Sequence, residues 1–358
     1  MKVAFITRST LYKVPGGDTE QITQTAKCLK DLGIETDIYL TNEQINYDSY
    51  DLLHFSNIIR PSDILYHTHK TNKPFVISPN LIDYSEYDRQ HRKGVFGFIF
   101  RLFSGNTNEY IKTVSRWLLK KDVLKTKSYV RKGHKKSIRE ILKKTSIVLP
   151  ASRSEQENLK KIYSIDPPCF VVPNGVDTNI FMPNGCAKDN HLVICAARIE
   201  GLKNQYNLIK ALNNSAYTLM IIGEAAPNQK KYYKKCKKIA AGNIIFTGRL
   251  SHEELVKIYK KAKVHVLPSW FETCGLSSLE AAAMGCNVVI TDKGYTREYF
   301  GEDAFYCDPS DPASIRKAVQ DACNSDPQKK LQKKVLDNYT WNRAAAITSE
   351  AYKKIIPV

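Results

Sequence analysis

Short apolar segments alternate with helical patterns along this chain, and the alternation starts a second time near the middle. Its first series of predicted strands is KVAFIT (2–7), ETDIYL (35–40), DLLHFS (51–56), PFVIS (74–78) and SIVLPAS (146–152). Helices are predicted near 20–32, where Gly33 ends the pattern, and at 155–163. Parallel neighbours require a crossover connection, and strand–helix–strand succession supplies one. The first part of the chain is therefore predicted to be an α/β domain with a parallel sheet.

The second series comes after PPCFVVPNGVD (167–177), whose proline and turn residues mark a domain boundary. SHEE at 251–254 matches a capping box at the start of a further helix. The predicted strands are HLVICAA, YTLMIIG, NIIFTG, VHVLPS, NVVIT and AFYCD, and the helices are 205–212, 230–240, 251–262, 276–284 and one from 312. Two such series in 358 residues predict two doubly wound, Rossmann-like domains facing across a cleft.

Most of the formal net charge of +18 lies in one block, residues 89–144, which holds 17 Lys and Arg but three acidic residues. Within it, GVFGFIFRLF (94–103) and SRWLLKKDVLK (115–125) mix apolar and basic side chains. Such a mixture suits a helix lying on an anionic membrane surface. The alternative is an insert packed on the first domain with a solvated basic face. No RRM, KH or zinc signature accompanies the charge, so nucleic acid is not the expected partner.

The cysteines and the apolar segments bear on cellular location. Nine cysteines are scattered without a CxxC pair, which favours reduced thiols over a disulfide framework. The sequence opens directly on a strand-like segment, and no apolar run reaches 18 residues. We expect a cytoplasmic protein, peripheral on the inner face of the cell membrane.

Two strand-to-helix turns carry groups suited to an anion. Gly16 and Gly17 precede the first helix, where backbone N–H groups can approach a negative ligand, although a plain glycine turn explains them equally well. Arg198 and Lys203 come after the strand HLVICAA and could neutralise a diphosphate, although solvated surface charge is an equal alternative. The GxGxxG fingerprint of dinucleotide dehydrogenases is absent.

Glu272 and Glu280 lie on either side of the turn that contains Gly275. Glu272 precedes the predicted helix 276–284 and Glu280 lies within it, so the carboxylates can accept hydrogen bonds from different parts of one extended ligand. Two surface acids that cap a helix are the alternative for this pair by itself.

Several segments together resemble family 4 glycosyltransferases. FETCGLSSLEAAAMGCNVV is similar to the family's E-x7-E motif, and VVPNGVDTNIF (171–181) to its N-G-V-D-x-x-x-F turn. AARIEGLKN, LMIIGE and GGDTEQITQTAKCLKDLG are similar to its basic element, its strand ending in Gly and its first Gly-Gly helix. These segments occur in the family's order and cover both halves of the chain.

The resemblance implies the GT-B fold, with an acceptor-side domain at 1–170, a nucleotide-sugar domain at 171–340 and a helix at 341–358 that returns to the first domain. It implies that Arg198 and Lys203 hold the diphosphate, that Glu272 contacts the transferred sugar and that Glu280 accepts from the ribose. The remaining implied donor-binding residues are Gly17, Thr273, Cys274, Gly275, Leu276, Gly248, Arg249 and Leu250. It also implies retention of anomeric configuration without a cofactor or bound metal, consistent with the absence of D-x-D.

The first domain departs from the family pattern. Many members carry a His after a strand where PFVISPNLIDYSEYD offers Asn80 and Asp83. Asp18 and His54 are further acceptor-side candidates, although a structural role for His54 is the stronger alternative. His67 and His69 are predicted to lie on the surface. KGYTRE, with Gly294 and Glu298, lacks one glycine of the family's Gly-Gly-x-x-E, which leaves the sugar open.

These features predict a retaining glycosyltransferase of the hexosyltransferase type that acts in bacterial surface polysaccharide synthesis. Its expected partners are a nucleotide-diphosphate sugar, a glycan or lipid-linked acceptor and an anionic membrane surface. The alternatives are a GT-B epimerase or phosphorylase, or a non-catalytic sugar- or nucleic-acid-binding protein. The base, the sugar and the acceptor are left unspecified by the sequence.

Overall fold

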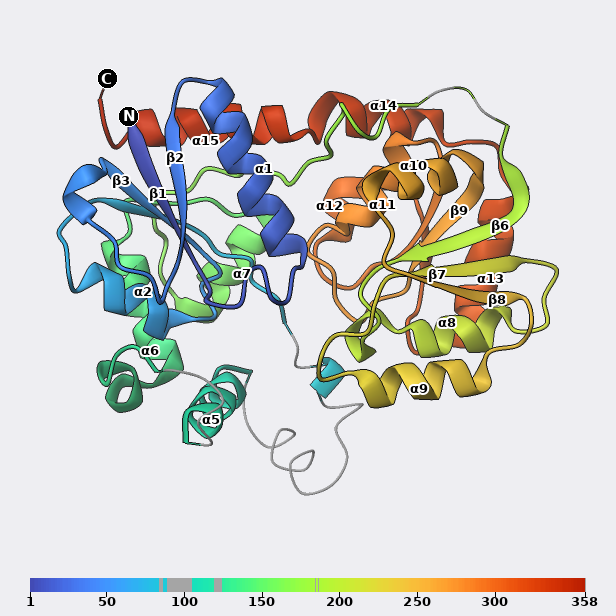
Figure 1. Ribbon diagram of the computed structural model, residues 1–358, viewed down its shortest axis with the longest axis horizontal. Coiled ribbons are helices and arrows are strands. Elements are labelled where there is room, and N and C mark those ends of the chain that lie inside the picture. Colours follow the sequence, from blue (N-terminus) through green and yellow to red (C-terminus); the bar gives the residue numbers. More distant parts are fainter. Residues whose placement is uncertain (84–85, 89–104, 119–123, 184, 186, 358) are drawn as a thin grey trace. The chain divides into compact units, whose positions relative to one another are not determined.

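The computed structural model describes residues 1–83, 86–88, 105–118, 124–183, 185 and 187–357. They form two compact units: unit 1 is Met1–Pro173 with Asn342–Val358, and unit 2 is Asn174–Trp341 (Figure 1). The basic segment 94–103 and the middle of 115–125 lie outside the described residues. Each unit is built on one parallel sheet.

Unit 1 contains a five-stranded parallel sheet in the order β2-β1-β3-β4-β5. The strands are β1 (Lys2–Thr7), β2 (Glu35–Leu40), β3 (Leu52–Ser56), β4 (Phe75–Ser78) and β5 (Ile147–Val148). The helices are α1 (Gly17–Asp31), α2 (Pro61–Thr68), α5 (Gly105–Leu118), α6 (Ser128–Lys144), α7 (Arg153–Tyr163) and α15 (Trp341–Lys353). Every residue of β3 and β4 is buried, as expected for parallel strands covered on both faces.

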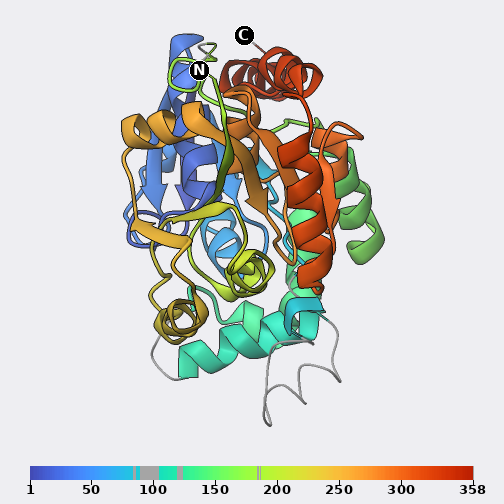
Figure 2. The same ribbon diagram turned by 90° about the vertical axis from the view of Figure 1, so that its right-hand side faces the viewer.

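Unit 2 contains a six-stranded parallel sheet in the order β11-β10-β9-β6-β7-β8. The strands are β6 (Asp189–Ala196), β7 (Thr218–Ile222), β8 (Ile244–Gly248), β9 (Ala262–Leu267), β10 (Asn287–Thr291) and β11 (Phe305–Cys307). The helices are α8 (Gln205–Leu212), α9 (Lys230–Ile239), α10 (His252–Lys261), α11 (Leu276–Ala283), α12 (Thr296–Phe300), α13 (Pro312–Asn324) and α14 (Lys329–Asn338). α8 and α9 lie on one side of this sheet and α10 and α11 on the other (Figure 1), and α13 runs beside the strands (Figure 2).

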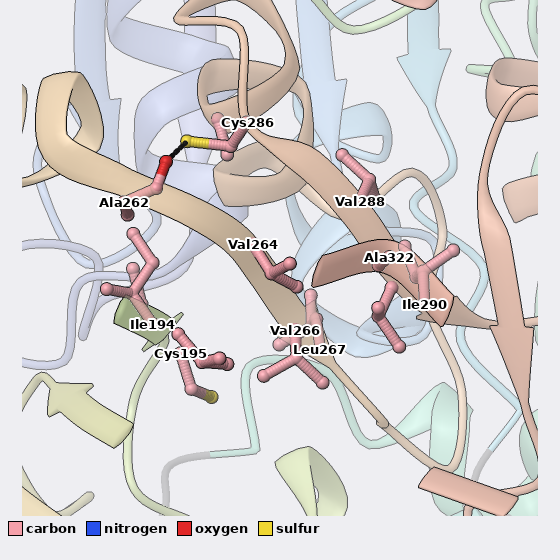
Figure 3. Close-up of a cluster of buried hydrophobic side chains, with 14 of the residues drawn as sticks. Ile194, Cys195, Ala262, Val264, Val266, Leu267, Cys286, Val288, Ile290 and Ala322 are labelled. Atoms are coloured by element: carbon pink, nitrogen blue, oxygen red, sulfur yellow. Dashed lines mark hydrogen bonds between the residues drawn. The ribbon is translucent and has the colours of Figure 1, made fainter. Parts of the chain in front are cut away.

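The core of unit 2 includes aliphatic side chains from its central strands as well as side chains from the covering helices. Ile194, Val264 and Val288 are fully buried and lie on neighbouring strands (Figure 3). Near one end of the cluster the thiol of Cys286 donates a 3.3 Å hydrogen bond to the carbonyl oxygen of Ala262. The apolar runs that predicted these strands are therefore apolar because both faces of the sheet are covered.

The structure corrects three details of the sequence analysis. Helix α1 starts at Gly17, about three residues earlier than predicted. β5 spans two residues instead of the seven of SIVLPAS, because Pro150 has no N–H to extend the ladder. His67 is buried and not on the surface; its ring nitrogens contact the hydroxyls of Tyr47 at 2.8 Å and Thr41 at 3.0 Å, and burial lowers its pKa to about 4.

The described residues contain no helix long and apolar enough to cross a membrane. They also contain no group of three or more His, Cys, Asp or Glu side chains close enough to hold a metal ion. The eight cysteines in the described part of the chain are all free thiols.

Candidate active site

The carboxyl ends of β6 and β9 carry the three charged residues predicted to act on a donor. β6 and β9 are neighbours in the sheet, but β6 leads on to β7 and β8 on one side while β9 leads to β10 and β11 on the other. This reversal is a topological switch point, outside which open α/β sheets bind ligands. Arg198 and Lys203 come after β6, and Glu272 comes after β9. The fold therefore brings together Lys203 and Glu272, 69 positions apart in the sequence, at the place where a ligand is expected.

Glu272 is held by two hydrogen-bond donors on the same carboxylate oxygen. The ammonium of Lys203 lies 2.6 Å from Oε1, and the hydroxyl of Ser269 donates to that oxygen at 2.5 Å. Ser269 is fully buried and Glu272 is 6% exposed. Among the described residues no hydrogen-bond donor contacts the other carboxylate oxygen of Glu272, Oε2. One oxygen is thus fixed by the protein while the other can accept from a ligand.

The backbone of Glu272 is fixed by the loop after β10. Its N–H donates to the carbonyl of Lys293 at 3.2 Å, and its carbonyl accepts from the N–H of Tyr295 at 2.9 Å. Gly294 lies between these contacts with φ of +96°, and a Cβ there would be 2.0 Å from the carbonyl oxygen of Glu272. The Gly that KGYTRE retains is therefore required by the close approach of these two loops.

The basic pair after β6 is also paired with carboxylates. Nη2 of Arg198 lies 3.0 Å from Oε1 of Glu200, and the Arg198 side chain is 40% exposed. Its backbone carbonyl accepts from the side-chain amide of Gln205 at 2.9 Å. Gly223, at the end of β7, has φ of +139° and a Cβ there would meet the carbonyl oxygen of Ala197 at 2.1 Å. Glycine at this position lets the β7 loop pass directly beside the basic turn.

Glu280 is held from a different helix. It lies on α11, and its Oε2 accepts from the hydroxyl of Tyr259 on α10 at 3.2 Å. The same hydroxyl is 3.1 Å from the carbonyl of Ser277. Tyr259 is fully buried, and burial together with the charge of Glu280 raises its pKa well above the ordinary value. A neutral hydroxyl donor therefore fixes the orientation of this carboxylate.

The turn before α11 presents backbone rather than reactive side chains. Gly275 is the helix N-cap with φ of +70°. Cys274 is 1% exposed, its sulfur accepts from Nδ2 of Asn174 at 3.3 Å, and burial raises its pKa to about 12. Thr273 in the turn and Leu276, the first residue of α11, are both half-buried. A protonated, buried thiol is no nucleophile, so the contribution of this turn to a ligand is its N–H groups and the positive end of the α11 dipole.

The predicted base-recognition segment comes after β8, on the other side of β7 from β6. Gly248 has φ of +77°, and its carbonyl accepts from the N–H of Gly223 at 2.8 Å. Arg249 is exposed and Leu250 is half-buried. The carboxyl ends of β9, β6, β7 and β8 therefore form one row. The predicted donor-site residues of this unit come after these strands, with Glu280 within helix α11.

In unit 1 the predicted residues occupy separate environments. Gly17 is the first residue of α1, and Asp18 accepts from the Arg8 guanidinium at 2.6 and 3.0 Å. His54 is 3% exposed, and both of its ring nitrogens are engaged, by Tyr352 at 2.6 Å and by Ser78 at 2.8 Å. Burial lowers the pKa of His54 to about 3, so the ring is neutral. This geometry fits the structural alternative for His54.

Asn80 and Asp83 come after β4. Asn80 has φ of +47°, and its amide donates to the Gln21 side chain at 2.7 Å. Asp83 lines a cavity of about 230 Å³ whose wall also includes Asp88 and His134.

Sequence reasoning missed the residues that orient the two glutamates. Ser269 precedes Glu272 by three positions, a spacing that could have suggested a side-chain contact in the turn. Tyr259 gave no sequence signal, because it is 21 positions from Glu280 on a helix whose apolar face accounts for a tyrosine.

Part of the chain matches a known protein family. Residues 176–338 match the family model for glycosyl transferases group 1. The matched segment lies within unit 2 and includes Arg198, Lys203, Glu272 and Glu280.

Curated relatives match about half of the chain. The D-inositol 3-phosphate glycosyltransferase of Acidothermus cellulolyticus is 27% identical over 213 residues, which are 51% of this chain and 48% of that protein. A probable sucrose-phosphate synthase of Thermosipho melanesiensis is 29% identical over 195 residues, 49% of this chain and 45% of that protein. The chain thus spans about half the length of the curated relatives it matches.

Solved structures match over nearly the whole chain. The sucrose-phosphate synthase of Thermosynechococcus elongatus has a TM-score of 0.74 at 16% identity and covers 99% of both chains. Anabaena HepE, solved in complex with UDP and glucose, has a TM-score of 0.71 at 15% identity and covers 99% of this chain and 100% of that one. These likenesses show the GT-B fold, with two Rossmann-like units, and confirm the predicted fold class.

Proposed function

We propose that the protein is a retaining glycosyltransferase that moves a sugar from a nucleoside-diphosphate donor to a hydroxyl group of an acceptor. The observation that carries this proposal is the cluster of Lys203, Glu272 and Ser269 at the switch point of unit 2, where Arg198 also follows β6. It joins two cations suited to a diphosphate to a carboxylate with one oxygen left for a sugar hydroxyl. The match to glycosyl transferases group 1 over the same residues supports it.

In this proposal the reaction is a substitution at the anomeric carbon. The bond from that carbon to the terminal phosphate oxygen breaks, and a bond to the acceptor oxygen forms on the same face of the sugar. The acceptor's proton goes to the departing phosphate. Arg198 and Lys203 would stabilise the negative charge that develops on the leaving group, which is the usual role of cations in such sites.

The two glutamates would hold the ends of the donor. Glu272 would accept from hydroxyls of the transferred sugar through Oε2, and Glu280 would accept from the ribose. The ammonium of Lys203 lies 2.6 Å from the carboxylate of Glu272. The diphosphate of a nucleotide sugar would therefore compete with this carboxylate for the ammonium. Donor entry would then release Glu272 from one of its two partners, with Ser269 keeping it in place.

UDP-glucose is the first donor to test, because HepE, a structural neighbour with a TM-score of 0.71, was solved in complex with UDP-glucose. A panel of UDP-, GDP- and ADP-sugars would be compared by thermal shift. A ligand at 100 times its Kd stabilises the folded protein by about 2.7 kcal/mol, which such an assay detects. If no nucleotide sugar stabilises the protein, the proposal is wrong and the non-catalytic alternative gains.

The site assignment is tested separately by transfer or donor hydrolysis in variants. Lys203→Ala removes one diphosphate cation and is expected to lower kcat by roughly 100-fold, as for other groups that stabilise developing charge. Lys257→Ala, which removes an exposed lysine of α10, is the matched control and should retain wild-type rates. Turnover that survives both Lys203→Ala and Glu280→Ala would exclude this site, and an epimerase or phosphorylase reaction would show as products other than a transferred sugar.

The acceptor is proposed to be a glycan or lipid-linked molecule at an anionic membrane, as in bacterial surface polysaccharide synthesis. Support comes from exposed Arg131, Lys135 and Lys136 on α6 of unit 1 and from Leu118, 68% exposed at the end of α5. Each basic residue near an anionic surface contributes about 1 kcal/mol.

Co-sedimentation with anionic vesicles tests the membrane contact. Replacing Arg131, Lys135 and Lys136 by Gln is expected to weaken binding on the order of 100-fold at low salt. The control replaces three exposed lysines of α9, at 231, 234 and 238, and changes the net charge equally. Equal weakening by both triple variants would mean that only net charge matters and would refute a docking face on α6.

A further inference from the structure

Unit 1 contains a cavity of about 240 Å³ at the switch point of its own sheet. Arg8 and Thr10, which come after β1, line it together with Asn57 and Arg60, which come after β3. β1 and β3 are neighbours in the order β2-β1-β3, where the direction of chain progression reverses. Open α/β sheets bind ligands at this place. The match to the family model spans 176–338 and does not include this cavity, so the chemistry of its ligand has to come from its lining.

The charged groups of the lining are already paired. Nε and Nη2 of the Arg8 guanidinium donate to the carboxylate of Asp18, at 2.6 and 3.0 Å. Arg60 lies 2.8 Å from the carboxylate of Asp63, which also lines the cavity. The remaining lining charge, Glu109, lies 2.6 Å from a lysine of its own helix. A charged ligand would have to break one of these pairs and leave its partner without compensation, so the cavity favours a neutral ligand.

The rest of the lining combines aromatic surface with polar atoms. Trp117, in the last turn of α5, is 38% exposed and lines the cavity with Tyr129 and Thr113. Oδ1 of Asn57 accepts from the N–H of Ile59 at 3.2 Å, while Nδ2 of Asn57 has no partner among the described residues. A ligand that matches this lining has a flat apolar face, hydroxyl groups and no charge.

Asn57 adds evidence that the wall is adapted to a ligand. Its φ is +70°, a left-handed conformation that few residues other than glycine adopt, although asparagine tolerates it. Non-glycine residues in this region concentrate at binding sites. The conformation directs the chain from β3 toward Arg60 and α2, which form one side of the cavity.

We propose that this cavity binds a neutral sugar ring, with one face on Trp117 and a hydroxyl accepting from Nδ2 of Asn57. In the proposed reaction this ring belongs to the acceptor, and this assignment as the acceptor's subsite rests on the proposed function. The volume of about 240 Å³ lies below that of most drug-sized ligand sites, which suits one ring rather than an oligosaccharide.

Intrinsic fluorescence provides a direct readout. The chain has three tryptophans; Trp270 and Trp341 are each 3% exposed, whereas Trp117 is 38% exposed. A ligand in the cavity should therefore change mainly the emission of Trp117. The full-length protein would be titrated with methyl glucoside, methyl galactoside, methyl mannoside and methyl N-acetylglucosaminide, and separately with inorganic phosphate and glucose 1-phosphate. Saturable emission changes are expected with at least one neutral glycoside and not with phosphate.

Variants locate the binding, which calorimetry measures where the fluorophore is removed. Trp117→Ala is expected to weaken glycoside binding by about tenfold, and Trp117→Phe, which keeps a smaller aromatic face, by less. Asn57→Gly keeps the backbone conformation and removes the carboxamide, so it should weaken binding several-fold. Leu118→Ala changes the next residue of α5, which is more exposed and does not line the cavity, and should bind like the wild type.

The results separate this inference from the proposed function. If no methyl glycoside binds while UDP-glucose still stabilises the protein, the cavity inference is wrong and the transferase proposal stands. A second outcome is that a glycoside binds, that Trp117→Ala weakens this binding, and that no nucleotide sugar binds. The cavity is then a sugar site, but it is not the acceptor subsite of a glycosyltransferase. Equal weakening by Leu118→Ala and Trp117→Ala, or tighter binding of inorganic phosphate than of any glycoside, would overturn the inference.

Discussion

Ser269 offers the sharpest test of how the proposed donor site is organised, because its hydroxyl contacts the carboxylate of Glu272 directly. It donates to Oε1 of Glu272 at 2.5 Å, and its side chain is fully buried. A hydrogen bond to a charged group contributes about 1.5–3 kcal/mol. If Glu272 acts on the sugar mainly in the transition state, Ser269→Ala should lower kcat roughly 10- to 100-fold.

The assay measures kcat and KM for UDP-glucose hydrolysis or transfer, together with the Kd of UDP. Because UDP lacks the sugar that Glu272 is proposed to contact, Ser269→Ala should leave the Kd of UDP close to the wild-type value. Ser215→Ala is the matched control: its hydroxyl also makes a short hydrogen bond, 2.7 Å to the carbonyl of Leu212, but it lies before β7, at the amino end of that strand.

A kcat within twofold of the wild type would refute the idea that Ser269 orients Glu272. A parallel loss of UDP affinity would assign Ser269 to the stability of the whole turn instead. Ser269→Thr, which keeps the hydroxyl, should recover part of the activity if the added methyl group is accommodated.

Gly294, Tyr259 and His54 each give a further prediction. Gly294→Ala should lower the melting temperature and abolish donor binding, since its Cβ would be 2.0 Å from the carbonyl of Glu272 and φ is +96°; unchanged thermal unfolding would contradict this. Tyr259→Phe removes the donor to Glu280 and should weaken UDP binding by about tenfold, with deoxy-UDP affected less, as measured by calorimetry. His54 is neutral when folded, with a pKa lowered from 6.5 to about 3, so protons bind preferentially to the unfolded chain between these values. The contribution of neutral His54 to the free energy of unfolding is therefore complete above pH 6.5. As the pH falls from 6.5 toward 3, the free energy of unfolding decreases by up to about 1.4 kcal/mol per pH unit. Urea unfolding of wild type and His54→Gln should show the shallower pH dependence in the variant.

The fold was readable from the sequence because parallel strands covered on both faces are continuous apolar runs. NVVIT and KVAFIT match β10 and β1, residue for residue. The predictions failed where long-range contacts decide. His67 looked like a surface residue, yet it is buried because the hydroxyls of Thr41 and Tyr47, 26 and 20 positions away, satisfy both of its nitrogens. No local pattern reports such a pairing.

The proposed donor-site residues were predicted from a resemblance to a family, not from composition. The side chains that contact them were predicted by neither route. The resemblance predicted that Lys203 and Glu272 contact the same ligand. Their direct contact with each other depends on β6 and β9 being neighbours in the sheet. Tyr259 on α10 contacts Glu280 on α11, and the amphipathic pattern of α10 does not predict which residue of another helix its tyrosine contacts. The roles assigned to all of these residues remain predictions.

Unit 1 is discontinuous in the sequence, and this has a consequence for the order in which the chain folds during synthesis. Its first part ends at Pro173, and its second part begins at Asn342, after all of unit 2. Tyr352, fully buried in that second part, contacts His54 across 298 positions. On the ribosome, unit 2 can therefore be complete while unit 1 still lacks the helix that covers His54. The usual order, in which the amino-terminal domain finishes first, is reversed, and chaperones would meet unit 1 as the incomplete partner.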